Sequence, residues 1–283
     1  MPRALLPVGI YIALTLAISW SGLLLVGGAG LFAGSNWRTD PQFLPAIQTM
    51  LLGPPVAGIL CTFLFSGTAG LRDLLVRLSR FRVDGRWYAV ALLGAPLLQG
   101  GVLLALSLAA PVYRPAILDS SDSAGLLLPA FAYGILGGVV EELGWTGFAI
   151  PRLRARFSVL GTGLIIGVVW GVWHLLQMWW VGSTSFEAVP AGIFLPTYFG
   201  TAIAALTAYR MLMVWVYDRT ASLLVAVLMH GSYIMCTLFV LAPPTTGRPF
   251  LVYSWAFVVV LWLTVAVVDR VAGLRRAPGV GGS

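Results

Sequence analysis

The residues of this chain best equipped for chemistry are two adjacent carboxylates, Glu141 and Glu142, inside a long apolar run. The run covers residues 126–150 and reads LLLPAFAYGILGGVVEELGWTGFAI. A charged side chain at the centre of a bilayer costs at least ~2.5 kcal/mol on insertion scales, so an acidic pair at that depth indicates a functional site. A buried carboxylate beside an imidazole can act as a general base and take a proton from water.

Imidazoles are present at comparable depth, because the two histidines of the chain, His174 and His230, also lie in apolar runs. A lone histidine in a membrane helix is often a packing residue that bonds to a neighbouring helix. Since both histidines accompany the acidic pair, we favour one catalytic constellation. At 1.5 Å per helical residue, Glu141 lies ~16 Å from Arg152 at the end of its helix. Groups from three helices can therefore meet at one depth.

The two acids cannot play the same part. Neighbouring residues on a helix point about 100° apart, so one carboxylate faces the reaction centre and the other supports it. Small residues would let the surrounding helices approach closely. The glycines expected to do so are Gly144, Gly147, Gly167 and Gly171.

The composition predicts the elements that hold these groups. Of the 283 residues, 59% are hydrophobic and 10% are charged, and several apolar runs exceed the length needed to cross a bilayer. We expect an all-α polytopic membrane protein with about eight transmembrane helices and an active site buried between them. The first run is too long for a signal peptide. The expected spans are 5–27, 43–66, 87–110, 126–150, 160–181, 190–215, 221–241 and 250–272.

The expected organisation has three parts. Residues 1–125 hold the first three transmembrane helices, residues 126–242 form the catalytic core, and residues 243–283 hold the last helix and a basic tail. Between the second and third spans, leucines at 71, 74, 75 and 78 follow helical spacing, with arginines on the remaining faces. This pattern predicts an amphipathic helix along the membrane surface, with a solvated loop as the alternative.

The net charge of +7 comes from arginine, because the chain contains no lysine. The arginines gather in short loops, so the positive-inside rule explains them better than nucleic-acid binding does, and the lipid bilayer is the expected partner. Their distribution predicts a multi-pass protein of the cell membrane with both termini in the cytoplasm. The arginines assigned to the cytoplasmic side are Arg3, the five of 72–86, the three of 152–156, Arg210, Arg219 and the three of 270–276. The two cysteines, Cys61 and Cys236, are expected to be small core residues.

Three motifs in order carry a resemblance to a known family: EELGWTGFAIPRL from Glu141, WGVWH ending at His174, and SLLVAVLMH ending at His230. They resemble the CPBP family of intramembrane proteases, also called the CAAX prenyl endopeptidase and Abi family. Its pattern is EExxxR, then an aromatic residue four before a histidine, then a histidine followed four residues on by asparagine. The segments GLRDLLVRLSRFRVDGRWYAVALL and YDRTASLLVAVLMH are also similar to family segments.

The resemblance implies hydrolysis of a peptide bond within the membrane, near a prenylated or other C-terminus. It implies that Glu141 activates a water with the help of His174, that His230 stabilises the oxyanion, and that Glu142 is a supporting acid. Trp170 takes the aromatic place. Such proteins were long called metalloproteases because Glu and His sets can ligate zinc. We favour a reaction without a cofactor, with zinc at the two histidines and Glu141 as the alternative, because HExxH spacing is absent.

Two positions depart from the family pattern. Thr146 replaces the arginine of EExxxR, so Glu142 lacks the counter-ion that the pattern provides. Ile234 replaces the asparagine after the second histidine, and an oxyanion donor of that kind is worth about 3–4 kcal/mol in a transition state. Tyr233 is the candidate for a replacement hydroxyl.

Three functions remain open at this point. The first is an active endopeptidase that cuts a peptide or protein substrate, lipidated or not, and the intact Glu141, His174 and His230 favour it. The second is a weakened family member that acts as a membrane partner or immunity-type protein, which Thr146 and Ile234 favour. The third is a proton-coupled transporter, which explains intramembrane acids but not the ordered motifs. The sequence identifies neither the substrate nor the oligomeric state.

Overall fold

The computed structural model describes residues 5–242 and 245–275, and within these ranges the regular structure is helical, without strands. Arg3 and the basic tail from 276 onward lie outside the described residues. Two π-helical turns, Trp145–Ala149 and Cys236–Val240, interrupt the longer elements. The α-helices are α1 (Leu6–Gly27), α2 (Phe43–Met50), α3 (Gly53–Leu78), α4 (Gly85–Ser107), α5 (Ala116–Asp119), α6 (Ser123–Gly144), α7 (Ile150–Arg154), α8 (Val159–Trp173), α9 (Leu175–Gly182), α10 (Ala191–Thr220), α11 (Leu223–Met235) and α12 (Gly247–Ala272).

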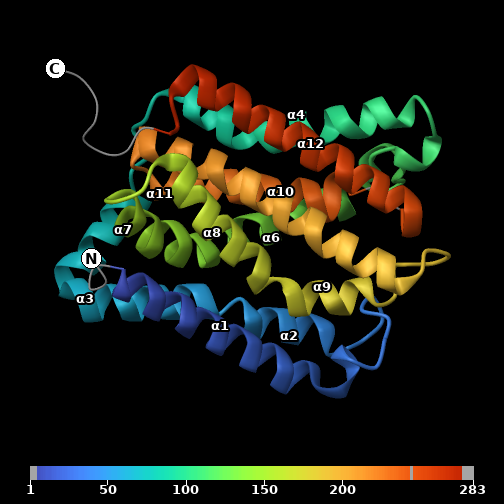
Figure 1. The fold of residues 1–283 in the computed structure, drawn as a ribbon, viewed down its shortest axis with the longest axis horizontal. Coiled ribbons are helices and arrows are strands. Elements are labelled where there is room, and N and C mark those ends of the chain that lie inside the picture. The colour runs from blue at the N-terminus through green and yellow to red at the C-terminus, as the bar shows by residue number, and fades with distance from the viewer. Residues whose placement is uncertain (1–4, 243–244, 276–283) are drawn as a thin grey trace.

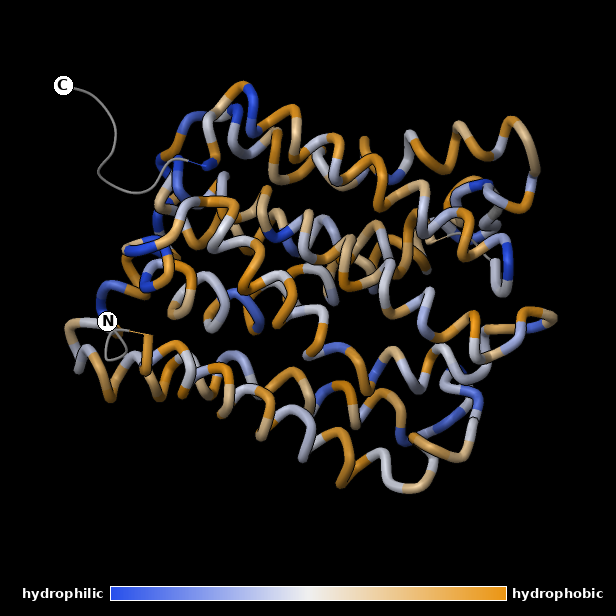
Figure 2. The backbone as a smooth tube through the Cα atoms, in the orientation of Figure 1, coloured by the Kyte–Doolittle hydropathy of each residue, from blue (hydrophilic) through white to orange (hydrophobic). Residues whose placement is uncertain are grey.

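The helices form a membrane-spanning bundle, which confirms the all-α polytopic prediction. Among the described residues, seven helical segments are long and apolar enough to cross a bilayer, and the bent pair α8 and α9 makes an eighth span if it is counted as one. In Figure 1, α1 begins and α12 ends at the same end of the bundle, as an even number of crossings requires. Hydrophilic stretches gather towards the two ends in Figure 2. The cytoplasmic orientation and the cell membrane stay predictions.

The expected surface helix is the second half of α3. Gly67 adopts a positive φ of 61°, which interrupts the helix and is easily reached only by glycine, so residues 68–78 form a separate segment. In this segment Leu74 is buried against Leu223 and Val227 of α11, whereas Leu75 is 63% exposed. The leucines therefore do not share one buried face. That the segment lies along the membrane surface stays a prediction.

Glycines set the distances between the helices that carry the acids and the histidines. A Cβ atom at Gly167 of α8 would lie 2.5 Å from the Thr207 Cα of α10, and one at Gly138 of α6 would lie 2.5 Å from the Val227 carbonyl oxygen of α11. Both helix pairs thus touch backbone to backbone, as small residues permit in membrane proteins. The expectation of close approach is confirmed at all four predicted glycines: Gly144 faces Pro54, Gly147 faces Leu74, Gly167 faces Thr207 and Gly171 faces Ile203.

These contacts generate a stability prediction. Gly167→Ala should lower the free energy of unfolding by about 1–3 kcal/mol, because overpacking a close contact forces backbone shifts. The matched control is Gly200→Ala on α10, where an added Cβ meets no atom within 4 Å. That variant should be neutral or stabilised by up to about 1 kcal/mol through helix propensity. Unfolding of both proteins in detergent, followed by tryptophan fluorescence, measures the difference; equal stability of the two would contradict the packing described here.

Candidate active site

The acidic pair lies at the point where α6 loses its regular geometry. Glu141 and Glu142 occupy the last turn of α6, and the π-helical turn Trp145–Ala149 follows directly. Two arginines hold carbonyl groups of this turn: Arg77 Nη2 donates to the Gly147 oxygen at 2.9 Å, and Arg152 Nη1 donates to the Phe148 oxygen at 3.0 Å. Single π-helical turns occur often at functional sites. Here the turn places the two carboxylates inside the bundle beside α8, α10 and α11.

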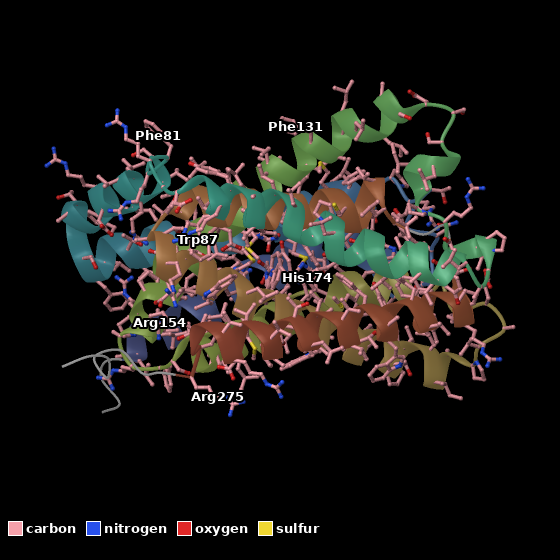
Figure 3. All side chains as sticks on the ribbon, turned by 90° about the horizontal axis from the view of Figure 1, so that it is seen from above. Phe81, Trp87, Phe131, Arg154, His174 and Arg275 are labelled. Atoms are coloured by element: carbon pink, nitrogen blue, oxygen red, sulfur yellow. The ribbon has the colours of Figure 1, made fainter. Side chains whose placement is uncertain are left out.

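His174 lies at a second irregularity, the 47° bend between α8 and α9. Its Nδ1 is 2.8 Å from the Trp170 carbonyl oxygen. Because a carbonyl oxygen only accepts, we assign the hydrogen to Nδ1, which leaves Nε2 as an acceptor. The imidazole is half-buried, unlike the carboxylates, and packs against Trp173 with ring centroids 4.6 Å apart. Figure 3 shows His174 near the middle of the bundle, with Arg154 closer to one end.

Glu141 has one oxygen held and the other turned to a histidine. Its Oε2 accepts a hydrogen bond of 2.8 Å from Trp170 Nε1, and its Oε1 lies 3.8 Å from His230 Nε2. The second distance is too long for a direct hydrogen bond. The side chain is 4% exposed. Glu141 thus presents one fixed and one available oxygen to the space beside His230.

Glu142 is fully enclosed by hydrogen-bond donors. Arg210 Nη1 lies 2.8 Å from each of its two oxygens, and His230 Nδ1 lies 2.7 Å from Oε1. The Thr146 hydroxyl donates to Oε2. Glu142 and Arg210 are both completely buried, so this is an ion pair without solvent contact. The donor that the family pattern places at position 146 is therefore supplied mainly from α10.

The position of Arg210 corrects the prediction that it lies on the cytoplasmic side. The apolar residues after it continue α10 to Thr220, which places Arg210 ten residues before the end of the helix and among fully buried side chains. The sequence did contain a signal for this site, because position 210 falls within the expected span 190–215. A charged group at that depth is costly unless it is paired, and two buried acids need a cation.

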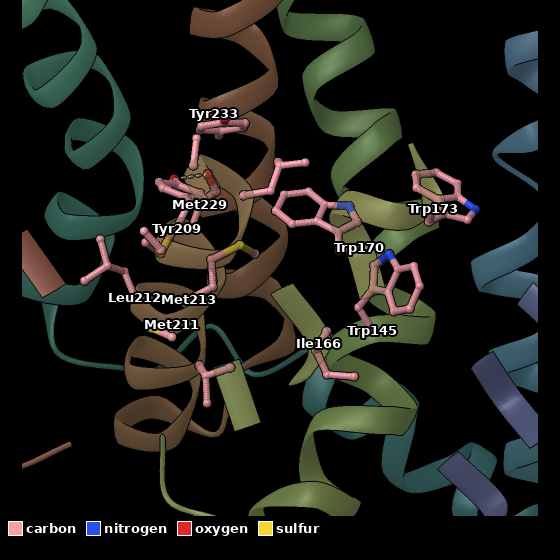
Figure 4. Close-up of a cluster of buried hydrophobic side chains, with 14 of the residues drawn as sticks. Trp145, Ile166, Trp170, Trp173, Tyr209, Met211, Leu212, Met213, Met229 and Tyr233 are labelled. Atoms are coloured by element: carbon pink, nitrogen blue, oxygen red, sulfur yellow. Dashed lines mark hydrogen bonds between the residues drawn. The ribbon is translucent and has the colours of Figure 1, made fainter. Parts of the chain in front are cut away.

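Trp170 connects the members of the site. Its ring lies 5.0 Å from that of His230 and 5.7 Å from that of His174, measured between centroids, and the Arg210 guanidinium lies 4.1 Å from its centre. A cation over an indole face is attracted by the ring quadrupole. Figure 4 shows Trp145 and Trp173 on one side of Trp170, and Tyr209, Met229 and Tyr233 on the other.

The remaining predicted residue, Tyr233, is placed differently. Its ring packs against that of Tyr209 with centroids 4.4 Å apart and the planes tilted by 30°, and its hydroxyl lies beside Thr237 in the π-helical turn Cys236–Val240 that follows α11. Ile234 points at α6, where its Cδ1 would be 2.6 Å from a Cβ at Gly137. The structure therefore brings together Glu141, Glu142, Thr146, Trp170, His174 and His230, and adds Arg210. It directs the Tyr233 hydroxyl elsewhere.

The donor groups of this site do not fit a zinc ion. Among the described residues, no three His, Cys, Asp or Glu side chains are placed to hold a metal together. The Nδ1 atoms of the two histidines face a carboxylate and a carbonyl oxygen, and Glu142 is already surrounded by donors. No step through a metal is derived from this arrangement.

Comparison with known proteins agrees with the motifs. Residues 123–236 match the family described as type II CAAX prenyl endopeptidase Rce1-like. CAAX prenyl protease 2 of Methanococcus maripaludis is 24% identical over 104 residues, which cover 36% of this chain and 37% of that protein. The matched family region holds the acidic pair and both histidines, and its range is close to the predicted core 126–242. Residues 123–236, which hold the site, are thus similar to the type II CAAX prenyl endopeptidases, and the chain spans 37% of the length of the curated relative it matches.

Proposed function

We propose that this chain is an intramembrane endopeptidase in which Glu141 acts as the general base that activates water. One observation carries the proposal: a buried carboxylate has one oxygen fixed by Trp170 and the other turned towards His230 Nε2. A fixed base beside an imidazole is the equipment for proton transfer from water. His174, whose Nε2 is free to accept, is the second group that orients this water.

The proposed reaction proceeds in two steps. Water gives a proton to Glu141, and the oxygen of this water attacks the carbonyl carbon of the peptide bond. The π electrons of the C=O bond move to the carbonyl oxygen. His230, which stands between two carboxylates, carries hydrogen on both nitrogens in this scheme and donates from Nε2 to that oxyanion. The oxyanion then re-forms the carbonyl group, the C–N bond breaks, and the departing amine takes the proton from Glu141.

The proposed substrate class is a membrane-anchored peptide or protein, cut near a prenylated or other C-terminus. The match of residues 123–236 to the CAAX prenyl endopeptidases and the name of the relative from Methanococcus maripaludis, CAAX prenyl protease 2, support this class.

A second candidate, a weakened family member that acts as a membrane partner, rests on one residue. Ile234 packs towards Gly137 and offers no hydrogen-bond donor where the family has asparagine. The other argument for weakened catalysis is that Thr146 leaves Glu142 without a counter-ion. Arg210 forms an ion pair with the Glu142 carboxylate, so this argument is weaker. A proton-coupled transporter would instead show proton-dependent solute uptake into vesicles.

The first prediction concerns the base. Glu141→Gln keeps the shape of the side chain but removes the basic oxygen, so the cleavage rate should fall about 10²–10⁴-fold. Farnesylated and unlipidated peptides, incubated with the purified protein in detergent and analysed by mass spectrometry, provide the measurement. Glu187→Gln is the matched control, because Glu187 lies in the loop before α10 and contacts Thr246 rather than the site. Cleavage that persists in the Glu141 variant would remove the proposed mechanism.

If the wild-type protein cuts none of these peptides but a membrane protein co-purifies with it, the membrane-partner function gains support. If the wild-type protein cuts none of these peptides but shows proton-driven uptake of a solute into vesicles, the transporter function gains support.

The second prediction concerns metal. Because no three His, Cys, Asp or Glu side chains among the described residues are placed to hold a metal together, treatment with a chelator followed by gel filtration should leave the cleavage rate unchanged. Elemental analysis of the same sample tests the point independently of the rate. Loss of activity that is restored by one equivalent of zinc would show that the metal-free mechanism is wrong.

A further inference from the structure

We propose that Arg210 is a positioning residue that keeps Glu142 ionised and thereby fixes the hydrogen of His230 on Nδ1. The inference rests on the proposed function for its effect on cleavage, but the state of the imidazole can be measured without any substrate. The cation that the EExxxR pattern would place at position 146 is then supplied by Arg210 on α10.

The contacts of Arg210 point to a single polar partner. Nη1 lies 2.8 Å from both oxygens of Glu142, whereas Nε and Nη2 have no hydrogen-bond partner in the part of the chain that the structure describes. The guanidinium carbon lies over the Trp170 ring, 4.1 Å from its centre. An arginine kept at this depth for packing alone would leave a buried charge uncompensated, which is strongly unfavourable. Its charge is therefore directed at Glu142.

The charge on Glu142 determines what His230 can do. An ionised carboxylate only accepts hydrogen bonds, so at 2.7 Å it requires the hydrogen of His230 on Nδ1. A carboxylate bonded to one ring nitrogen fixes the orientation of the ring and the tautomer, and so determines the state of the other nitrogen. That other nitrogen, Nε2, is the one turned towards Glu141. Without a cation, Glu142 would take up a proton and could donate to Nδ1 instead.

A cation at position 146 and the cation at position 210 would contact the same carboxylate, that of Glu142. Thr146 lies one turn after Glu142 and its hydroxyl donates to Oε2, which Arg210 also contacts. Both side chains are fully buried. Removal of the arginine side chain at 210 therefore frees space next to position 146. An arginine placed there could reach the same carboxylate.

The experiment reads the two histidines directly. Because the chain contains only two, protein labelled with ¹⁵N-histidine gives signals from two rings, and a His174→Gln sample assigns them. The variants are Arg210→Gln, which keeps a polar side chain but not the charge, Arg210→Lys, which keeps the charge, and the exchange Thr146→Arg with Arg210→Ala. Circular dichroism and thermal unfolding in detergent show which proteins are folded.

If Arg210 positions His230, the wild type shows a protonated Nδ1 at His230, and Arg210→Gln loses that signature. Arg210→Lys and the exchanged protein should retain it. Where cleavage is measurable, kcat of Arg210→Gln should fall about 10- to 100-fold with KM little changed, as for other partners that orient a histidine. The Lys variant and the exchange should recover most of the rate.

The proposal is wrong if folded Arg210→Gln keeps the wild-type ¹⁵N signature, or if the Lys and exchange variants lose it as Gln does. If Arg210→Gln does not fold, the protein with Thr146→Arg and Arg210→Ala provides the test. A protonated His230 Nδ1 in that protein supports the proposal, and its loss overturns the proposal. A wild-type protein that cuts no peptide would contradict the proposed function alone, because the protonation of Nδ1 is still measured.

Discussion

The rest of the site depends on a buried ion pair between Glu142 and Arg210. Neither side chain touches solvent, and each would be very costly at this depth without the other. The pair places an acceptor against His230 Nδ1, and the same guanidinium lies on Trp170, which in turn holds Glu141. One electrostatic contact between α6 and α10 therefore fixes both carboxylates and one imidazole relative to each other.

The helices are irregular where the chemistry is placed. The π-helical turn after Glu142 and the bend at His174 both interrupt otherwise continuous spans. Arg77 and Arg152 bond carbonyl oxygens of the π-helical turn, so its irregular backbone is not left unsatisfied in an apolar environment. Arg77 and Arg152, which the positive-inside rule assigned to the cytoplasmic side, thus also hold the backbone that follows the acidic pair.

The sequence predicted the helical bundle and the convergence of Glu141, Glu142 and the two histidines, because apolar run length and intramembrane charge are local signals. It did not predict that Arg210 belongs to the site. The positive-inside rule assigned this arginine to the cytoplasmic side, although position 210 lies within an expected span. It also could not predict the direction of the Tyr233 hydroxyl. Helical spacing gives the face of a residue, but the neighbours Tyr209 and Thr237 decide where the side chain points.

The glycine contacts divide the site into two halves. Gly163 and Gly167 fix α8 on α10, which makes one unit of His174, Trp170 and Arg210; Gly138 and Gly231 fix α6 on α11, which makes another of both acids and His230. The seam between the halves holds no glycine contact among the described residues, and its hydrogen bonds join Trp170 to Glu141, Arg210 to Glu142, and Tyr209 to the Met229 carbonyl. The two halves are therefore held together mainly by the buried ion pair, and any opening along this seam would have to separate Glu142 from Arg210 while it left the glycine contacts within each half intact.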